Sequence, residues 1–165
     1  MRICVCPGSY DPVTLGHLDV ARRALGMFDR VVLAVMVNPA KRGSFEAADR
    51  VAMIEESVAE RLDPDAGRRV QAASFAGRLL VDICAELGAS AIVKGLRGGS
   101  DFAYELPMAR MNKHLTGIET VFLPGDPSLE HVSSSLIKEV FAHGADVSDM
   151  VPSAVLSRLP ALPSG

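Results

Sequence analysis

The sequence predicts an α/β fold, an open and mainly parallel β-sheet with helices on both faces. Short apolar runs alternate five times along the chain with stretches in which apolar residues recur every three or four positions. Residues 31–37 are apolar without interruption, which is typical of a central parallel strand covered on both faces. Because the links between these segments are short, successive strands are expected to run parallel through helical crossovers.

Strands are expected where a short apolar run is bounded by turn residues. Pro7-Gly8 closes the first run, and Asn38-Pro39 stops the second. The third run is the weakest of the set. The expected strands are residues 3–6, 31–37, 70–74, 91–93 and 120–123.

Helices are expected where apolar residues line up on one face. Gly88 and Gly144 are expected to end two of these helices, and Pro152 is expected to open a short last one. Pro107 falls inside the longest helix and is expected to kink it, because proline cannot donate a hydrogen bond to the carbonyl of Ala103. The expected helices are residues 17–28, 51–62, 80–87, 101–115 and 134–142.

Together these elements predict one Rossmann-like, doubly wound unit with a five-stranded parallel sheet. We expect a single domain over residues 1–158, followed by a flexible tail rich in Pro and Ser over residues 159–165. In such sheets, ligands bind beyond the carboxyl ends of the strands, where the strand order reverses. The loops expected to carry function are residues 7–16, 38–45, 94–100 and 124–132.

Composition excludes several classes of protein. A net charge of −3 argues against a general nucleic-acid binder, which carries a basic excess. The longest purely apolar run, residues 31–37, is far shorter than the about 20 residues of a membrane-spanning helix. No signal peptide is expected. Three cysteines without metal-ligand spacing are expected to be reduced thiols, which indicates a cytoplasmic protein.

His17 is the first candidate functional residue. It follows a tight turn out of the first strand and stands at the start of a helix, where backbone N–H groups and the helix dipole attract anions. A neutral or protonated imidazole there can donate a hydrogen bond to a phosphate oxygen. An isolated histidine in this place would more simply cap the helix. The run Thr14-Leu15-Gly16-His17 between strand and helix favours the phosphate interpretation.

Three further groups sit in the expected ligand-binding loops. Lys41 follows the turn after the second strand, either as a mobile charge over the strand ends or as an ordinary solvated lysine. Lys94 and Arg97 flank Gly95, where a missing Cβ lets the backbone approach a ligand. Residues 133–135 are three serines before a helix, and capping that helix requires only one of them.

The first loop resembles the PG(S/T)FDPxTxGH pattern of the phosphopantetheine adenylyltransferase family, within the nucleotidyltransferase superfamily. Tyr10 stands where phenylalanine is common. Five more segments resemble family motifs in order: NPAK at 38–41, IVKGLR at 92–97, DFAYE at 101–105, MNKHL at 111–115 and SSSLIKEV at 133–140. The resemblance runs from about residue 3 to residue 152. Two departures are Pro107 and the Leu-Glu-His run at 129–131, where relatives often carry an aromatic-Ser-Phe stretch.

The resemblance implies a set of site residues. Three roles are considered for Glu105: it holds the nucleotide ribose, it orients the basic residues, or it is an ordinary surface carboxylate. Leu80 either lines the acceptor groove or only packs in the core. The implied catalytic residues are Ser9, His17, Lys41 and Arg97. The implied ATP contacts are Ser9, Tyr10, His17, Gly95, Leu96, Arg97, Glu105, Leu129, Glu130, His131, Val132, Ser133, Ser134 and Ser135. The implied phosphopantetheine contacts are Ser9, Lys41, Leu80 and Lys94.

The resemblance also implies a reaction, in which ATP and 4′-phosphopantetheine give dephospho-coenzyme A and pyrophosphate. The acceptor phosphate has a second pKa near 6 and is largely a dianion at neutral pH, so no general base is required. His17 would stabilise the α-phosphate during in-line attack, with Ser9 assisting, while Lys41 and Lys94 align the anions. Mg²⁺ would arrive with ATP, without a dedicated cluster of protein ligands.

A homohexamer and feedback inhibition by coenzyme A are further implications of the resemblance. Two other functions stay open at this point. One is a related nucleotidyltransferase that adenylates nicotinamide mononucleotide or uses CTP with a phosphoalcohol. The other is a nucleotide-binding subunit without catalytic activity.

Overall fold

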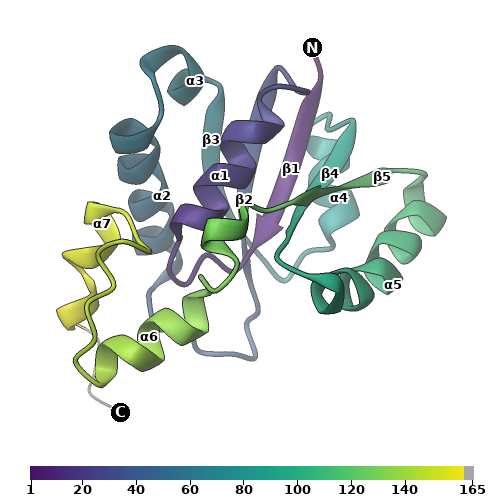
Figure 1. The fold of residues 1–165 in the computed structure, drawn as a ribbon. Coiled ribbons are helices and arrows are strands. Elements are labelled where there is room, and N and C mark those ends of the chain that lie inside the picture. The colour runs from purple at the N-terminus through teal and green to yellow at the C-terminus, as the bar shows by residue number, and fades with distance from the viewer. Residues whose placement is uncertain (162–165) are drawn as a thin grey trace.

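The computed structural model describes residues 1–161 and contains one five-stranded sheet. Every strand pairing is parallel, which confirms the predicted fold class. The strand order is β3-β2-β1-β4-β5, so the order reverses between β1 and β4 (Figure 1). The strands are β1 (Ile3–Gly8), β2 (Arg30–Val37), β3 (Val70–Ala76), β4 (Ala91–Leu96) and β5 (Glu119–Pro124).

The helices connect these strands in the expected alternation (Figure 1). Two additional 3₁₀ turns are η1 (Pro127–Leu129) and η2 (Leu159–Ala161). The helices are α1 (Leu15–Ala24), α2 (Ala47–Arg61), α3 (Pro64–Arg68), α4 (Leu80–Glu86), α5 (Gly99–Thr116), α6 (Ser134–Ala142) and α7 (Ser153–Leu156). Within residues 1–161, none of them is both long enough and apolar enough to pass through a membrane.

The core lies on both faces of the sheet, because successive strand residues point to opposite sides. On one face, Leu33 and Val93 pack in a large cluster with residues of α1 and α2 such as Leu18 and Ile54. On the other face, a smaller cluster joins strand residues such as Ile92 to α4. Both clusters are almost fully buried, so the sheet has helices on both faces as predicted.

Several element boundaries differ from the prediction. Helix α1 begins at Leu15 rather than at His17, because the Thr14 side chain accepts a hydrogen bond from the His17 backbone N–H and caps the helix. The same helix ends at Ala24, since the chain then turns through Gly26. Helix α3 was not predicted; its N-cap is the Asp63 side chain. Helix α5 continues through Pro107. The kink expected at this proline stays a prediction.

The chain end also departs from the expected boundary. Leu159 is 1% exposed and belongs to the core, so the fold extends past residue 158, where the flexible tail was expected to begin. Residues 162–165 of that expected tail lie outside the described residues. The three cysteines, Cys4, Cys6 and Cys84, are free and buried in the structure.

Gly95 on β4 lies close to Val20 of α1. A Cβ at this position would lie 2.5 Å from a Val20 methyl group. We therefore predict that Gly95→Ala lowers the free energy of unfolding by about 1–3 kcal/mol through overpacking. Urea unfolding measures this. The double variant Gly95→Ala with Val20→Ala should regain part of the loss, whereas Gly99→Ala, where a Cβ meets no atom, should stay near wild type. Equal effects at both glycines would contradict the packing argument.

Candidate active site

A cleft of about 600 Å³ opens at the point where the strand order reverses. The end of β1, the start of α1, the end of β4 and the start of α6 all contribute to it. Most of the predicted ATP contacts meet here, which is where parallel sheets of this order bind ligands. The cleft is lined by the predicted residues Ser9, His17, Lys94, Gly95, Arg97, Glu105, Leu129, Val132, Ser133, Ser134 and Ser135.

An apolar channel of about 520 Å³ adjoins this cleft and extends between α4 and α5. Leu80, one of the predicted acceptor contacts, lies in its wall beside Met108. Ser9, Lys94 and Glu105 line both the cleft and the channel. The junction is therefore a polar point, with one cation and one carboxylate, between a polar cleft and an apolar channel.

His17 is held by a reciprocal capping arrangement at the start of α1. The Thr14 side chain accepts from the His17 backbone N–H, and the Thr14 backbone N–H donates to His17 Nδ1 over 3.0 Å. The Tyr10 ring packs edge-on against the imidazole, with 4.9 Å between ring centroids. A backbone N–H can only donate, so Nδ1 must be the acceptor nitrogen. The proton of a neutral His17 therefore sits on Nε2.

The pKa of His17 is lowered from 6.5 to about 4. Burial of the ring is the largest cause, and the positive charges of Arg97 and Lys94 add to it. The imidazole is thus neutral at pH 7 in the protein without ligand. Of the two protonation states that the sequence left open, the structure selects the neutral one. His17 is a hydrogen-bond donor through Nε2, not a cation.

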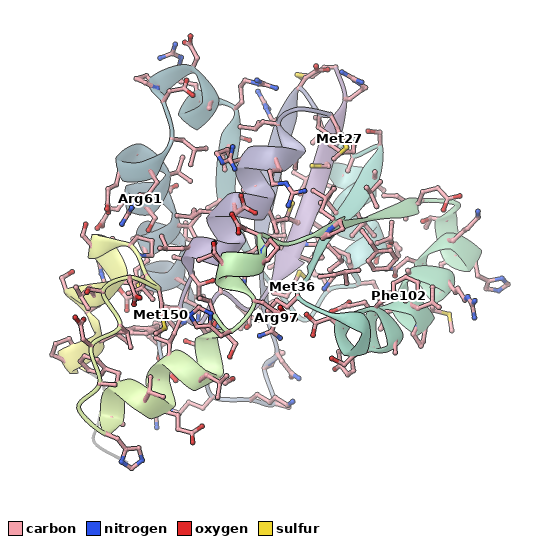
Figure 2. The ribbon with its side chains drawn as sticks, viewed as in Figure 1. Met27, Met36, Arg61, Arg97, Phe102 and Met150 are labelled. Carbon is pink, nitrogen blue, oxygen red and sulfur yellow. The ribbon has the colours of Figure 1, made fainter. Side chains whose placement is uncertain are left out.

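Two cations of the cleft are held in place by carboxylates of α5. Lys94 Nζ lies 3.1 Å from Glu105. Arg97 donates to Asp101 through both its backbone N–H, over 2.9 Å, and its Nε, over 3.1 Å, and Figure 2 labels its side chain. Glu105 therefore orients a basic residue, one of the roles considered for it from the sequence.

The serine-rich start of α6 combines capping with open donors. Ser133 caps the helix, accepting from the Leu136 N–H over 3.2 Å, and Ser134 Oγ donates to the Pro12 carbonyl over 2.8 Å. Ser135 is exposed at the cleft. As first residues of the helix, Ser134 and Ser135 have backbone N–H groups without an intrahelical acceptor. This helix end can accept an anion.

Five predicted contacts lie elsewhere. Tyr10 is 4% exposed and its hydroxyl donates to the Cys6 carbonyl, so only its backbone can reach a ligand. Lys41 is exposed on the loop after β2 and lines neither the cleft nor the channel. Leu96 and Glu130 line a neighbouring hollow of about 370 Å³. His131 is exposed and lines none of these three spaces.

An ion cluster centred on Asp11 was missed by the sequence analysis. Its carboxylate accepts from the backbone N–H groups of Ser44 and Phe45, over 2.8 and 2.9 Å. Lys138 Nζ and Arg50 Nε lie 3.3 and 3.4 Å from it. Burial raises the pKa of Asp11, but the backbone donors and the two cations outweigh burial and lower the pKa. Asp11 thereby joins the first loop, the loop that carries Lys41 and helix α6.

Arg50 extends this cluster to the first loop at Ser9. It is 6% exposed and donates to the carbonyls of Phe45 and Ser9. A Cβ at Gly43 would overlap its guanidinium, so any larger residue there would have to displace the Arg50 side chain. Asp11 and Lys138 stand within motifs that the sequence analysis had singled out, whereas Arg50 resembled any solvated arginine of an amphipathic helix.

The low pKa of His17 predicts a pH-dependent stability. The unfolded chain binds a proton at this residue as the pH falls through about 6.5, whereas the folded protein does so only near 4. As the pH falls from about 6.5 to about 4, the free energy of unfolding of the wild type should therefore decrease by up to about 3 kcal/mol more than that of His17→Gln. Denaturant unfolding of both proteins from pH 7 to pH 4 measures the difference. Parallel pH profiles would contradict the assignment.

Asp11→Asn should destabilise the protein by about 3 kcal/mol, because it leaves Arg50 buried without its counter-charge. Denaturant unfolding at pH 7 measures this. Asp65→Asn is the matched control, since the Asp65 side chain is 86% exposed in its pair with Arg68. An Asp11 variant as stable as the control would show that the cluster contributes nothing to holding the loops.

Relatives of known name share this sequence over almost its whole length. A phosphopantetheine adenylyltransferase from Micrococcus luteus is 52% identical over 159 residues, which cover 96% of this chain and 98% of that protein. One from a Nocardioides species is 52% identical over 161 residues, covering 98% and 97%. The similarity therefore covers nearly the whole of this chain and of both relatives.

The fold is shared more widely. A solved bifunctional NMN adenylyltransferase/ADP ribose pyrophosphatase from Francisella tularensis superposes with a TM-score of 0.69 at 15% identity, over 97% of this chain and 49% of that one. The model of the cytidylyltransferase-like family matches residues 5–140. With its His17 turn and serine-rich helix end at the reversal of the strand order, this chain belongs to the cytidylyltransferase-like family and, within it, to the phosphopantetheine adenylyltransferases.

Proposed function

We propose that this protein transfers the adenylyl group of ATP to 4′-phosphopantetheine, giving dephospho-coenzyme A and pyrophosphate. One observation carries the proposal: the apolar channel meets the polar cleft at Ser9, Lys94 and Glu105. An acceptor with a phosphate at one end of an apolar arm matches this junction, and a nucleotide triphosphate matches the cleft. The names of the relatives, at 52% identity, support the same reaction.

ATP would lie in the cleft. The β- and γ-phosphates would take the open N–H groups and hydroxyls at the start of α6, contributed by residues 133–135. Arg97, already oriented by Asp101, would pair with the phosphates, and Leu129 and Val132 would contact the nucleoside. Leu96, Glu130 and His131 would reach the nucleotide only from the rim of the cleft.

Phosphopantetheine would place its phosphate at Lys94 and its arm along the channel wall at Leu80. Lys41 would act from the loop after β2, as a mobile charge above the two anions. The Asp11 carboxylate anchors that loop at Ser44 and Phe45, only a few residues beyond Lys41. Because the loop is anchored at Ser44 and Phe45, the Lys41 ammonium can move only a limited distance from the two bound anions.

The chemical step would be a direct in-line displacement. An oxygen of the acceptor phosphate forms a bond to the α-phosphorus, while the bond from that phosphorus to the bridging oxygen of the β-phosphate breaks and pyrophosphate leaves. His17 Nε2–H would donate to an α-phosphate oxygen as charge develops there, and its proton stays on the nitrogen. Ser9 would assist from the adjacent loop.

Mg²⁺ would bind mainly through the phosphates of the nucleotide. Within residues 1–161 there is no group of three or more His, Cys, Asp or Glu side chains that could hold a metal, and Glu105 and Asp101 are engaged by Lys94 and Arg97. This donor set suits a metal that enters with its substrate. The ion would offset the charge of the triphosphate and of the leaving pyrophosphate.

Assembly and location complete the proposal. Tyr104, Met108, Met111 and Leu115 are all exposed by more than half and recur along one side of α5. In a homohexamer, another copy packed against this side would cover the outer edge of the channel that Met108, Met111 and Leu115 line. We further propose a cytoplasmic enzyme that is inhibited by coenzyme A, because coenzyme A carries the same pantetheine arm and would occupy the same channel.

Pyrophosphate release with ATP, Mg²⁺ and 4′-phosphopantetheine tests the reaction. We expect turnover with this acceptor and none with nicotinamide mononucleotide, which has no arm to fill the channel. Turnover with nicotinamide mononucleotide alone would assign the related activity instead. Tight binding of ATP without any pyrophosphate release would indicate a non-catalytic subunit.

His17→Ala should lower kcat by a factor of about 10²–10³, which is typical of removing one preorganised donor to a transition state. The same pyrophosphate assay measures it. His143→Ala is the matched control, because His143 is exposed at the far end of α6 and should leave kcat unchanged. Near-normal turnover of His17→Ala would remove this residue from the mechanism.

A further inference from the structure

The Lys41 loop, residues 38–45 after β2, is fixed at both of its ends. At its start, the carbonyl of Asn38 accepts a hydrogen bond from the backbone N–H of Lys41 over 3.0 Å and closes a turn. At its far end, the backbone N–H groups of residues 44–45 donate to the Asp11 carboxylate. Lys41 itself is exposed between these ends. The position of its ammonium therefore depends on how firmly the far end is held.

Lys138 of α6 joins this far end to the rest of the site. Its Nζ donates to Ser44 Oγ over 2.8 Å and lies 3.3 Å from a carboxylate oxygen of Asp11. Lys138 stands one helical turn after Ser134, whose hydroxyl donates to the Pro12 carbonyl. One face of α6 thus contacts two consecutive residues of the first loop and the Lys41 loop as well. In Figure 1 the loop after β2 lies below the sheet, next to α6.

The contacts of Lys138 are partly sheltered from solvent. Its side chain is 24% exposed, and that of Asp11 is 13% exposed. Water and salt screen such a pair less than they screen charges on the open surface. An ammonium group carries three donors, so it can bond the carboxylate and the Ser44 hydroxyl at the same time. The contact is therefore suited to hold two loops together.

Lys138 lies outside the spaces proposed for the two substrates. It lines neither the cleft nor the channel, and its ammonium is engaged by Asp11 and Ser44. Its influence on the reaction would therefore pass through the loop that it holds. Lys41, three residues before Ser44, is the charge whose position this contact controls.

We propose that Lys138 is a positioning residue, which holds the far end of the Lys41 loop against α6 and thereby places the Lys41 ammonium. The inference rests on the proposed function, in which Lys41 acts above the two anions. Displacing a group by about 1 Å can lower a rate by about 10²-fold. Releasing the loop therefore lowers turnover even though Lys138 touches neither substrate.

The experiment compares two variants of Lys138 with a control that breaks a different ion pair. Lys138→Met removes the charge and keeps the length of the side chain, whereas Lys138→Arg keeps a cation that can bond two acceptors. Arg158→Met is the control. It breaks the pair with Glu56 that ties the segment after α7 to α2, and neither residue lines the cleft or the channel. Lys41→Ala and the double variant Lys41→Ala with Lys138→Met complete a mutant cycle.

Two measurements are made on these proteins. Pyrophosphate release with ATP, Mg²⁺ and 4′-phosphopantetheine gives kcat and the KM for ATP. The rate of trypsin cleavage after Lys41 and Arg42, followed by mass spectrometry on the protein without substrates, reports how often the loop opens. The second measurement does not depend on any activity.

We expect Lys138→Met to lower kcat by about 10–100-fold with the KM for ATP nearly unchanged, and Lys138→Arg to restore most of the turnover. In the Lys41→Ala background, Lys138→Met should have no further effect on kcat, because it acts through Lys41. Trypsin should cleave the loop faster in Lys138→Met than in the wild type or in Arg158→Met.

Two results would overturn the proposal. One is an equal loss of kcat in both backgrounds, which would assign Lys138 to direct phosphate contact or to general stability. The other is trypsin cleavage of Lys138→Met at the wild-type rate. If Lys138→Met does not fold, Ser44→Ala removes the same contact from the loop side and must show the same pattern more weakly. If the wild type releases no pyrophosphate, the proposed function fails, and the cleavage rates alone decide this inference.

Discussion

The hydrogen bond from the Thr14 backbone N–H to His17 Nδ1 is the interaction on which the site depends. It closes the turn between β1 and α1, and it leaves the imidazole proton on Nε2. Burial and the nearby cations Arg97 and Lys94 keep the ring neutral. A neutral donor is suited to a step in which negative charge develops on a phosphate oxygen but no proton has to be transferred.

The remaining parts of the site are arranged around that turn by the strand order. Because β1 is central and the order reverses beside it, the carboxyl ends of β1 and β4 and the start of α6 converge on one cleft. Ion pairs then fix the loops: Asp11 holds the loop after β2, and Asp101 holds Arg97. The basic side chains of the cleft are thus held in fixed positions by carboxylates.

Much of this arrangement could be predicted from the sequence, because it follows from periodicity and loop position. The alternating pattern predicted the parallel sheet, and His17 and the serines at 133–135 were expected at one edge because parallel strand ends lie together. The burial of Tyr10 could not be predicted, since a loop aromatic carries no periodic pattern. The unpaired, buried Thr120 hydroxyl on β5 was missed for another reason: whether a polar atom finds a partner depends on tertiary packing alone.

The ¹⁵N chemical shifts of the His17 ring test the central claim most directly, since they report which nitrogen carries the proton. In the ligand-free protein at pH 7, the structure predicts an unprotonated Nδ1 and a protonated Nε2. Replacing Thr14 by valine, which removes the side-chain cap but keeps the backbone N–H donor, should leave this tautomer in place. A proton on Nδ1, or an imidazolium with both nitrogens protonated, would contradict the account.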